Sequence, residues 1–168
     1  MTRLDSAIRR LTAQRDLLDW AAREIAGLPG CVLELGLGNG RTYDHLRARL
    51  PERTIYVFER SPAAHPACMP PPDRLVVGDI FETLPRFAAR VGPGSVVLIH
   101  SDLGTGDDAG NRVFCRRLSP LVAPLLAPGG LLLADQPFDL PDCRDVCGEV
   151  GIKRERYFAY RRPAPDAG

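Results

Sequence analysis

The feature that most constrains this chain is a run of alternating glycines, Gly36, Gly38 and Gly40, directly after the apolar segment 31–35. That segment predicts a strand buried on both faces, and the residues from 42 to 50 repeat apolar side chains at helical spacing. A tight glycine turn between a strand and a helix leaves free backbone N–H groups and a positive helix end beside any ligand above it. The sequence therefore predicts an α/β fold with a ligand site at this turn.

The glycine spacing separates two classes of ligand. Dinucleotide-binding proteins use G-x-G-x-x-G, whose third glycine lets the helix and the strand pack closely. Counted from Gly36 that place holds Arg41, and counted from Gly38 it holds Tyr43, so the fingerprint fails in both registers. A carboxylate, Glu34, stands at the end of the strand instead. A carboxylate there suits a cationic ligand and would lie badly beside a pyrophosphate.

The pattern Glu34-x-Gly36-x-Gly38-x-Gly40 resembles the first motif of the class I S-adenosylmethionine-dependent methyltransferases, (Asp/Glu)-x-Gly-x-Gly-x-Gly. The resemblance covers nearly the whole chain. It implies a Rossmann-like three-layer α/β sandwich with a mostly parallel sheet and a C-terminal antiparallel edge strand. It also implies S-adenosylmethionine as the cofactor and methyl transfer as the reaction.

Two further acids stand where such a cofactor needs partners. Glu59 lies about twenty residues beyond the glycine turn, where nucleotide-binding α/β folds place a ribose-binding acid. The resemblance implies that Asp79 accepts the adenine amino group and that Ile80 packs on the adenine ring. The residues expected to bind the cofactor are Glu34, Gly36, Gly38, Asn39, Gly40, Thr42, Glu59, Arg60, Asp79, Ile80, His100 and Ser101.

The loop after the apolar segment 95–99 carries a titratable pair, His100 and Asp102. Ligands of open α/β sheets lie beyond the carboxyl ends of the strands, so this loop should face the transferable methyl group. Methyl transfer from a sulfonium is an in-line displacement with a good leaving group, and a base is needed only if the acceptor must lose a proton. The catalytic candidates are His100 first, Asp102 second and Asp135 third.

The same strand ends resemble those of divalent-metal-dependent O-methyltransferases, which carry Asp-x-Asp and Asp-Asn there. This chain has His100-Ser-Asp102 and Asp135-Gln136 instead. Magnesium prefers carboxylate and carbonyl oxygen, so His100 is a poor replacement ligand. We expect no metal site.

The remaining elements follow from apolar runs and from Gly and Pro. Thr2 and Asp5 are placed to form a capping box at the start of a helix 2–27. Expected after the glycine turn are strands at 54–58, 75–77, 95–99 and 131–135; a proline-rich loop at 61–72; helices at 81–91, at 108–127 with a break at Ser119-Pro120, and at 139–150; a turn at 128–130; and a final strand at 154–161.

A length of 168 residues suits one domain, which we place at 1–162, followed by a flexible tail at 163–168. The net charge of +1 gives no indication of a nucleic-acid or membrane surface. No signal segment or membrane-length apolar run is visible, and the five cysteines fit free thiols, so we expect a cytoplasmic location. Lys153 is the only lysine beside many arginines, a bias that indicates a bacterial source.

Two alternatives to a methyltransferase stay open. A nicotinamide-dependent, NAD(P)-using oxidoreductase shares the order of elements, and a non-catalytic S-adenosylmethionine-binding subunit would use the same cofactor residues. No substrate domain is inserted in the chain, so we expect a small-molecule methyl acceptor. Apolar residues on the first helix are compatible with a homo-oligomer.

Overall fold

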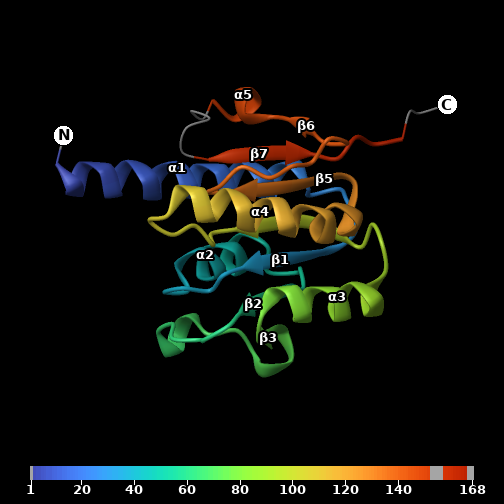
Figure 1. Cartoon of the computed structure of the whole chain (residues 1–168), viewed down its shortest axis with the longest axis horizontal. Helices are drawn as coiled ribbons and strands as arrows, with labels where there is room; N and C mark the ends of the chain where they lie inside the picture. The colour runs from blue at the N-terminus through green and yellow to red at the C-terminus, as the bar shows by residue number, and fades with distance from the viewer. Residues whose placement is uncertain (1, 152–156, 166–168) are drawn as a thin grey trace.

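The apolar segments of the chain form the strands of one twisted sheet (Figure 1). The computed structural model describes residues 2–151 and 157–165. Within them the strand order is β3-β2-β1-β4-β5-β7-β6. The strands are β1 Cys31–Leu35, β2 Ile55–Glu59, β3 Leu75–Val77, β4 Val96–Ser101, β5 Leu126–Ala134, β6 Arg144–Asp145 and β7 Phe158–Arg161. Strands β1 to β5 are parallel, and β7 is antiparallel to β5 and β6. The predicted α/β class with a mostly parallel sheet is confirmed.

Helices cover both faces of the sheet and make it the middle of three layers. The helices are α1 Arg3–Glu24, α2 Arg41–Arg49, α3 Ile80–Val91, α4 Asp108–Val122 and α5 Cys147–Val150, with short 3-10 turns η1 Pro66–Cys68, η2 Pro72–Arg74 and η3 Ala123–Leu125. One buried apolar cluster joins α1 and α2 to the sheet, and a second joins α3 and α4 to the opposite face. The predicted three-layer arrangement is therefore confirmed.

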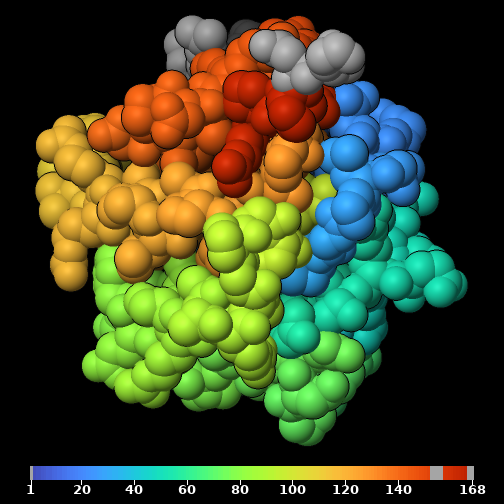
Figure 2. Space-filling model, turned by 90° about the vertical axis from the view of Figure 1, so that its right-hand side faces the viewer, coloured from blue at the N-terminus to red at the C-terminus, as the bar shows by residue number. Residues whose placement is uncertain are grey.

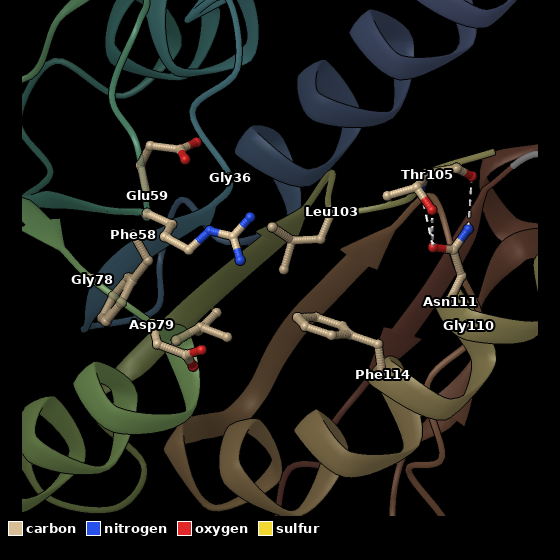
Figure 3. Close-up of a pocket in the computed structure, with 12 residues that line it drawn as sticks. Gly36, Phe58, Glu59, Gly78, Asp79, Leu103, Thr105, Gly110, Asn111 and Phe114 are labelled. Atoms are coloured by element: carbon tan, nitrogen blue, oxygen red, sulfur yellow. Dashed lines mark hydrogen bonds between the residues drawn. The ribbon is translucent and has the colours of Figure 1, made fainter. Parts of the chain in front are cut away.

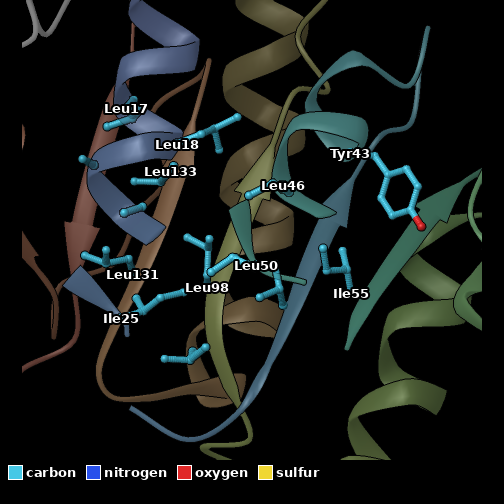
Figure 4. Close-up of a cluster of buried hydrophobic side chains, with 14 of the residues drawn as sticks. Leu17, Leu18, Ile25, Tyr43, Leu46, Leu50, Ile55, Leu98, Leu131 and Leu133 are labelled. Carbon is cyan, nitrogen blue, oxygen red and sulfur yellow. The ribbon is translucent and has the colours of Figure 1, made fainter. Parts of the chain in front are cut away.

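Helix α1 is capped at its start and packs against the sheet in its second half. At its start Thr2 and Asp5 form the predicted capping box, with each side chain bonded to the other residue's backbone N–H. Along its second half, Leu17, Leu18 and Ile25 are fully buried against the sheet (Figure 4). The first half carries an exposed apolar stripe instead, made of Leu4, Ile8 and Leu11.

The predicted break of the fourth helix at Ser119-Pro120 is wrong, because α4 runs through Pro120 to Val122. Proline removes one backbone hydrogen bond from a helix interior. Here Leu118 and Val122 are buried on either side of it, and the Ser119 hydroxyl donates to the Cys115 carbonyl at 2.7 Å. Packing of the buried stripe outweighs the lost bond.

The predicted turn at 128–130 is also corrected, because these residues lie inside β5. The pairing of β4 with β5 shifts register between Val96 and Leu98, so the Pro-Gly-Gly segment forms a bulge. A Cβ on Gly130 would lie 2.8 Å from the Ala127 carbonyl oxygen and 3.1 Å from that of Val97. The glycine is needed because the bulged strand folds closely onto its own backbone.

The predicted helix at 139–150 is the largest error. The structure has a loop, the two-residue strand β6 and a helix, α5, of only four residues. Phe138 and Leu140 pack on the α3–α4 side of the sheet, whereas Val146 and Cys147 pack on the α1–α2 side. One helix cannot bury both sets on opposite faces.

The final strand is confirmed as antiparallel from Phe158, and residues 154–156 of the prediction lie outside the described residues. Outside β7, β6 forms the edge of the sheet. In the proposed tail, residues 163–165 have no regular structure, and residues 166–168 lie outside the described residues. The division into a domain and a tail stays a prediction.

All five cysteines are free, as predicted. No helix in the described part of the chain is long and apolar enough to cross a membrane.

The sheet brings the ends of its parallel strands to one edge, where α1 begins and the glycine turn lies (Figure 1). Figure 2 looks onto the opposite end of the molecule, where the blue segment after α1 and the yellow-green segment before β4 lie side by side. There Cys31 N–H donates to the Ser95 carbonyl at 3.0 Å. The switch of strand order between β1 and β4 directs ligands to the carboxyl edge.

Replacing Leu18 with alanine should lower the free energy of unfolding by about 2–5 kcal/mol, because the side chain is only 1% exposed and leaves a cavity. Urea denaturation followed by circular dichroism measures the change. The same substitution at Leu4, which is 68% exposed on the same helix, should change the stability by less than about 0.5 kcal/mol. Equal effects at the two positions would contradict this description of the core.

Candidate active site

The glycine turn leaves β1 at Leu35 and enters α2, whose N-cap is Gly40. All three of its glycines have positive φ, at +90° for Gly36, +49° for Gly38 and +78° for Gly40, where other residues are strained. A Cβ on Gly36 would lie 2.9 Å from the Leu103 side chain, and one on Gly40 would lie 2.6 Å from the Cβ of Cys68. Nothing lies within 4 Å of a Cβ on Gly38. The turn is thus packed at its two ends and open at its centre.

Glu59, at the end of β2, holds the glycine turn. Its Oε2 accepts the N–H groups of Leu37 at 2.9 Å and Gly38 at 3.3 Å, and its Oε1 accepts that of Ser61 at 2.9 Å. Burial alone would raise the pKa of Glu59, but these backbone hydrogen bonds lower it below the usual range. The carboxylate is therefore ionised at neutral pH.

A cavity of about 360 Å³ lies beside this carboxylate (Figure 3). In Figure 3 Glu59 and Asp79 lie on one side of it, and Leu103 and Phe114 lie opposite. Asp79 is the N-cap of α3 and accepts the Phe81 N–H at 2.8 Å. The residues that line this cavity are Gly36, Phe58, Glu59, Arg60, Gly78, Asp79, Ile80, Leu103, Thr105, Gly110, Asn111 and Phe114. We call this the first cavity.

The outer wall of the first cavity is set by a local hydrogen-bond network. The Asn111 side chain, from α4, accepts the N–H of Thr105 at 3.0 Å and donates to its carbonyl at 2.8 Å. This network fixes the loop between β4 and α4, which carries Leu103. The apolar side of the cavity therefore comes from a loop tied to α4, and its polar side comes from β2 and the start of α3.

Two further cavities share lining residues with the first one around the loop from Asp102 to Thr105. A second cavity of about 140 Å³ is lined by Arg10, Leu11, Gln14, Gly36, Leu37, Gly38, Asn39, Arg41, Thr42 and Asp102. A third, of about 460 Å³, is lined by Arg10, Asp102, Gly104, Thr105, Asp135, Gln136 and Tyr157. The second shares Gly36 with the first, the third shares Thr105 with the first, and Arg10 and Asp102 line both the second and the third.

Beneath these cavities lies a buried ion pair. Glu34 on β1 and His100 on β4 face each other in register, both without exposed surface. His100 Nδ1–H donates to Glu34 Oε2 at 2.8 Å, and the Thr42 hydroxyl donates to Glu34 Oε1. Burial alone would lower the pKa of His100, but the charge and hydrogen bond of Glu34 raise it. The direction of this shift favours the charged form of His100 beside Glu34.

Two carboxylates line the third cavity. Asp102 Oδ2 accepts the Gln14 side-chain N–H at 3.1 Å, and Asp135 Oδ2 accepts the Gly104 N–H at 2.9 Å. Burial and the nearby charge of Asp102 raise the pKa of Asp135. Among the described residues, Asp135 Oδ1 and the Tyr157 hydroxyl are buried without a hydrogen-bond partner.

The structure brings most of the predicted site residues to one edge. Those lining a cavity are Gly36, Gly38, Asn39, Thr42, Glu59, Arg60, Asp79, Ile80, Asp102 and Asp135. The others, Glu34, Gly40, His100 and Ser101, are buried below the cavities. In the described part of the chain, no group of three or more His, Cys, Asp or Glu is arranged to hold a metal ion.

Sequence reasoning missed several lining residues because they come from elements far from the glycine turn. They are Arg10, Leu11 and Gln14 from α1, Leu103, Thr105, Asn111 and Phe114 around the start of α4, and Tyr157 before β7. The only signal available for Gln14 was a polar residue within the apolar stripe of the first helix, between Leu11 and Leu18.

A glycine turn at the strand-order switch, with an acid at the end of the next strand, defines a Rossmann-like enzyme of the class that binds a nucleoside cofactor. A family model described as S-adenosyl-L-methionine methyltransferase matches residues 1–162. The chain therefore belongs to this family and is an S-adenosylmethionine-dependent methyltransferase, with S-adenosylmethionine as its methyl donor. This assignment replaces the two alternatives left open by the sequence.

Solved structures agree with the family. The chain is 44% identical to an S-adenosyl-L-methionine methyl transferase from Silicibacter pomeroyi DSS-3, over 96% of this chain and 99% of that one, with a TM-score of 0.89. It is 20% identical to a release-factor-specific protein-(glutamine-N5) methyltransferase from Alicyclobacillus acidocaldarius, over 90% and 92% of the two chains, with a TM-score of 0.55. The second likeness shows the fold alone. Among proteins with curated functions, none matches.

Replacing Glu34 with alanine should lower the free energy of unfolding by about 3–5 kcal/mol, because it leaves His100 buried without the partner that stabilises its charged form. The contribution of a group with a raised folded pKa is full below its unfolded pKa, about 6.5, and is lost as the pH rises through the folded value. The cost should therefore be largest below pH 6.5, as measured by urea denaturation across pH.

Glu82→Ala serves as the control, because Glu82 makes only an exposed pair with Arg86 at 4.0 Å. It should change the stability by less than about 0.5 kcal/mol at every pH. A Glu34→Ala variant as stable as Glu82→Ala would show that the buried pair is not formed.

Proposed function

We propose that this enzyme transfers the methyl group to a small-molecule acceptor by in-line displacement, with the cofactor spread over two of the three cavities. Adenosine occupies the first cavity, the amino-acid end of the cofactor occupies the second, and the acceptor occupies the third. The observation that carries this proposal is that all three cavities meet at the segment from Asp102 to Thr105. The transferable methyl group then lies at this junction.

The residues of the first cavity suit adenosine. Glu59 is an ionised acceptor, and a ribose hydroxyl can replace its longest bond, the one from Gly38 at 3.3 Å. Asp79 and Ile80 line the same cavity, where they suit the amino group and the face of an adenine ring. The glycine cradle supports this fit, because a side chain on Gly36 would collide with the cavity wall.

The residues of the second cavity suit a zwitterion. Asp102 is held by Gln14 and offers a negative charge to the ammonium group. Arg10 and Arg41 line the same cavity and offer positive charge to the carboxylate. The open centre of the turn at Gly38 lets the ligand approach the backbone.

When bound, the cofactor supplies a methyl carbon on a cationic sulfur that leaves readily. The chain's own work is then to align the acceptor and to exclude water. Arg10, Leu11 and Gln14 from α1 cover the junction. In this assignment Asp135 accepts any proton that the acceptor loses, because its pKa is raised and it lines the third cavity. His100 has no exposed surface, so it acts as a positioning residue for Asp102.

Replacing Gly38 with leucine should weaken the binding of S-adenosylhomocysteine about 10- to 100-fold, or about 1.4–2.8 kcal/mol, because the new side chain fills the second cavity. Isothermal titration calorimetry measures this. Gly151→Leu is the matched control, because Gly151 also has positive φ, has no described residue within 4 Å of a Cβ and lines none of the three cavities. Unchanged affinity in Gly38→Leu would remove the second cavity from the proposal.

Replacing Glu59 with alanine should weaken the binding of the same ligand by about 1–3 kcal/mol, the range for losing hydrogen bonds to a charged group. Glu52→Ala changes an exposed glutamate outside the first cavity and should leave the affinity unchanged. If both variants bind equally well, Glu59 does not contact the ribose.

A further inference from the structure

We propose that the acceptor is a small amine and that its nitrogen receives the methyl group. The inference rests on the proposed function, because it concerns the cavity assigned there to the acceptor. It is carried by two carboxylates and a buried, unpartnered tyrosine hydroxyl that line one cavity of about 460 Å³.

The two carboxylates face the third cavity together because of the register of the sheet. Ser101 on β4 pairs with Ala134 on β5, and Asp135 N–H donates to the Ser101 carbonyl at 3.1 Å. Asp102 and Asp135 are the residues that directly follow these two strands. Both therefore leave the sheet on the same face. Each carboxylate is also oriented by a donor, Gln14 for Asp102 and Gly104 for Asp135.

Tyr157 gives an independent indication of a ligand. Its side chain is 1% exposed, lines the third cavity, and has a hydroxyl without a partner among the described residues. A buried polar group without a hydrogen bond is costly, so a ligand atom is expected to complete it. Asp135 Oδ1, in the same cavity, is also buried without a partner there. An amine has N–H donors for both oxygens, whereas a carboxylate acceptor has none.

The charges around the third cavity favour a cation at its floor. Burial and the charge of Asp102 raise the pKa of Asp135, and burial together with the charges of both carboxylates raises the pKa of Tyr157 to about 12. Among the described lining residues Arg10 alone is cationic; it interacts with the Tyr157 hydroxyl and lowers that pKa, but burial and the two carboxylates outweigh it. Such a negative potential stabilises an ammonium group and disfavours a phenolate or carboxylate nucleophile.

The chemistry balances without a further reactant. The ammonium form of the acceptor gives one proton to the Asp135 carboxylate and becomes a neutral amine. The nitrogen lone pair then forms the new C–N bond while the C–S bond breaks, and sulfur keeps that electron pair. The product is an N-methylammonium ion, and the proton on Asp135 passes to solvent, which restores both carboxylates beside the product.

The test uses the full chain saturated with S-adenosylhomocysteine and two sets of fragments matched in shape. The sets are benzylamine, benzyl alcohol and benzoate, and butylamine, butanol and butanoate. Saturation-transfer NMR and calorimetry measure their binding to the wild type, to Asp135→Asn and to Tyr157→Phe. Asp142→Asn, which changes an exposed acid outside all three cavities, is the control.

The amines should bind at least about 10-fold more tightly than their matched alcohols and carboxylates. Asp135→Asn should reduce amine binding at least about 5-fold, Tyr157→Phe should also weaken it, and Asp142→Asn should not. All variants should keep wild-type affinity for S-adenosylhomocysteine, which shows that they fold. Equal binding of the three classes, preference for the carboxylates, or no fragment binding would overturn the inference. If the wild type does not bind S-adenosylhomocysteine at all, the proposed function is contradicted instead.

Discussion

The site depends on the hydrogen bonds between the Glu59 carboxylate and the backbone of the glycine turn. These bonds join the carboxyl ends of β1 and β2, because Glu59 closes β2 and accepts backbone N–H groups of Leu37 and Gly38 directly after β1. Without that carboxylate, three alternating positive-φ glycines would leave the turn with many conformations. With it, the turn presents its open centre to the second cavity and its side to the first.

The buried pair of Glu34 and His100 plays a similar part between β1 and its other neighbour, β4. It links β1 to β4 across the switch in strand order, and Thr42 joins it to the start of α2. Asp102 follows His100 by two residues, so the pair sets where that carboxylate enters the junction of the cavities.

The sequence predicted the parts of the fold and site that depend on short-range pattern. Strand, glycine turn, Glu59 and Asp79 follow one another at fixed spacings, and the structure places all of them at one edge. The helix predicted at 139–150 was wrong because the apolar side chains of this segment pack on opposite faces of the sheet. The spacing of apolar residues along the sequence does not show this. Arg10 and Tyr157 were missed for a related reason: they reach the third cavity from opposite ends of the chain.

The most direct test of the central claim is a crystal structure of the protein with S-adenosylhomocysteine. We expect the ribose within hydrogen-bond distance of Glu59, the adenine beside Asp79 and Ile80, and the sulfur directed at the junction near Asp102. Density for the ligand away from the glycine turn, with Glu59 still bonded only to Leu37, Gly38 and Ser61, would contradict the account.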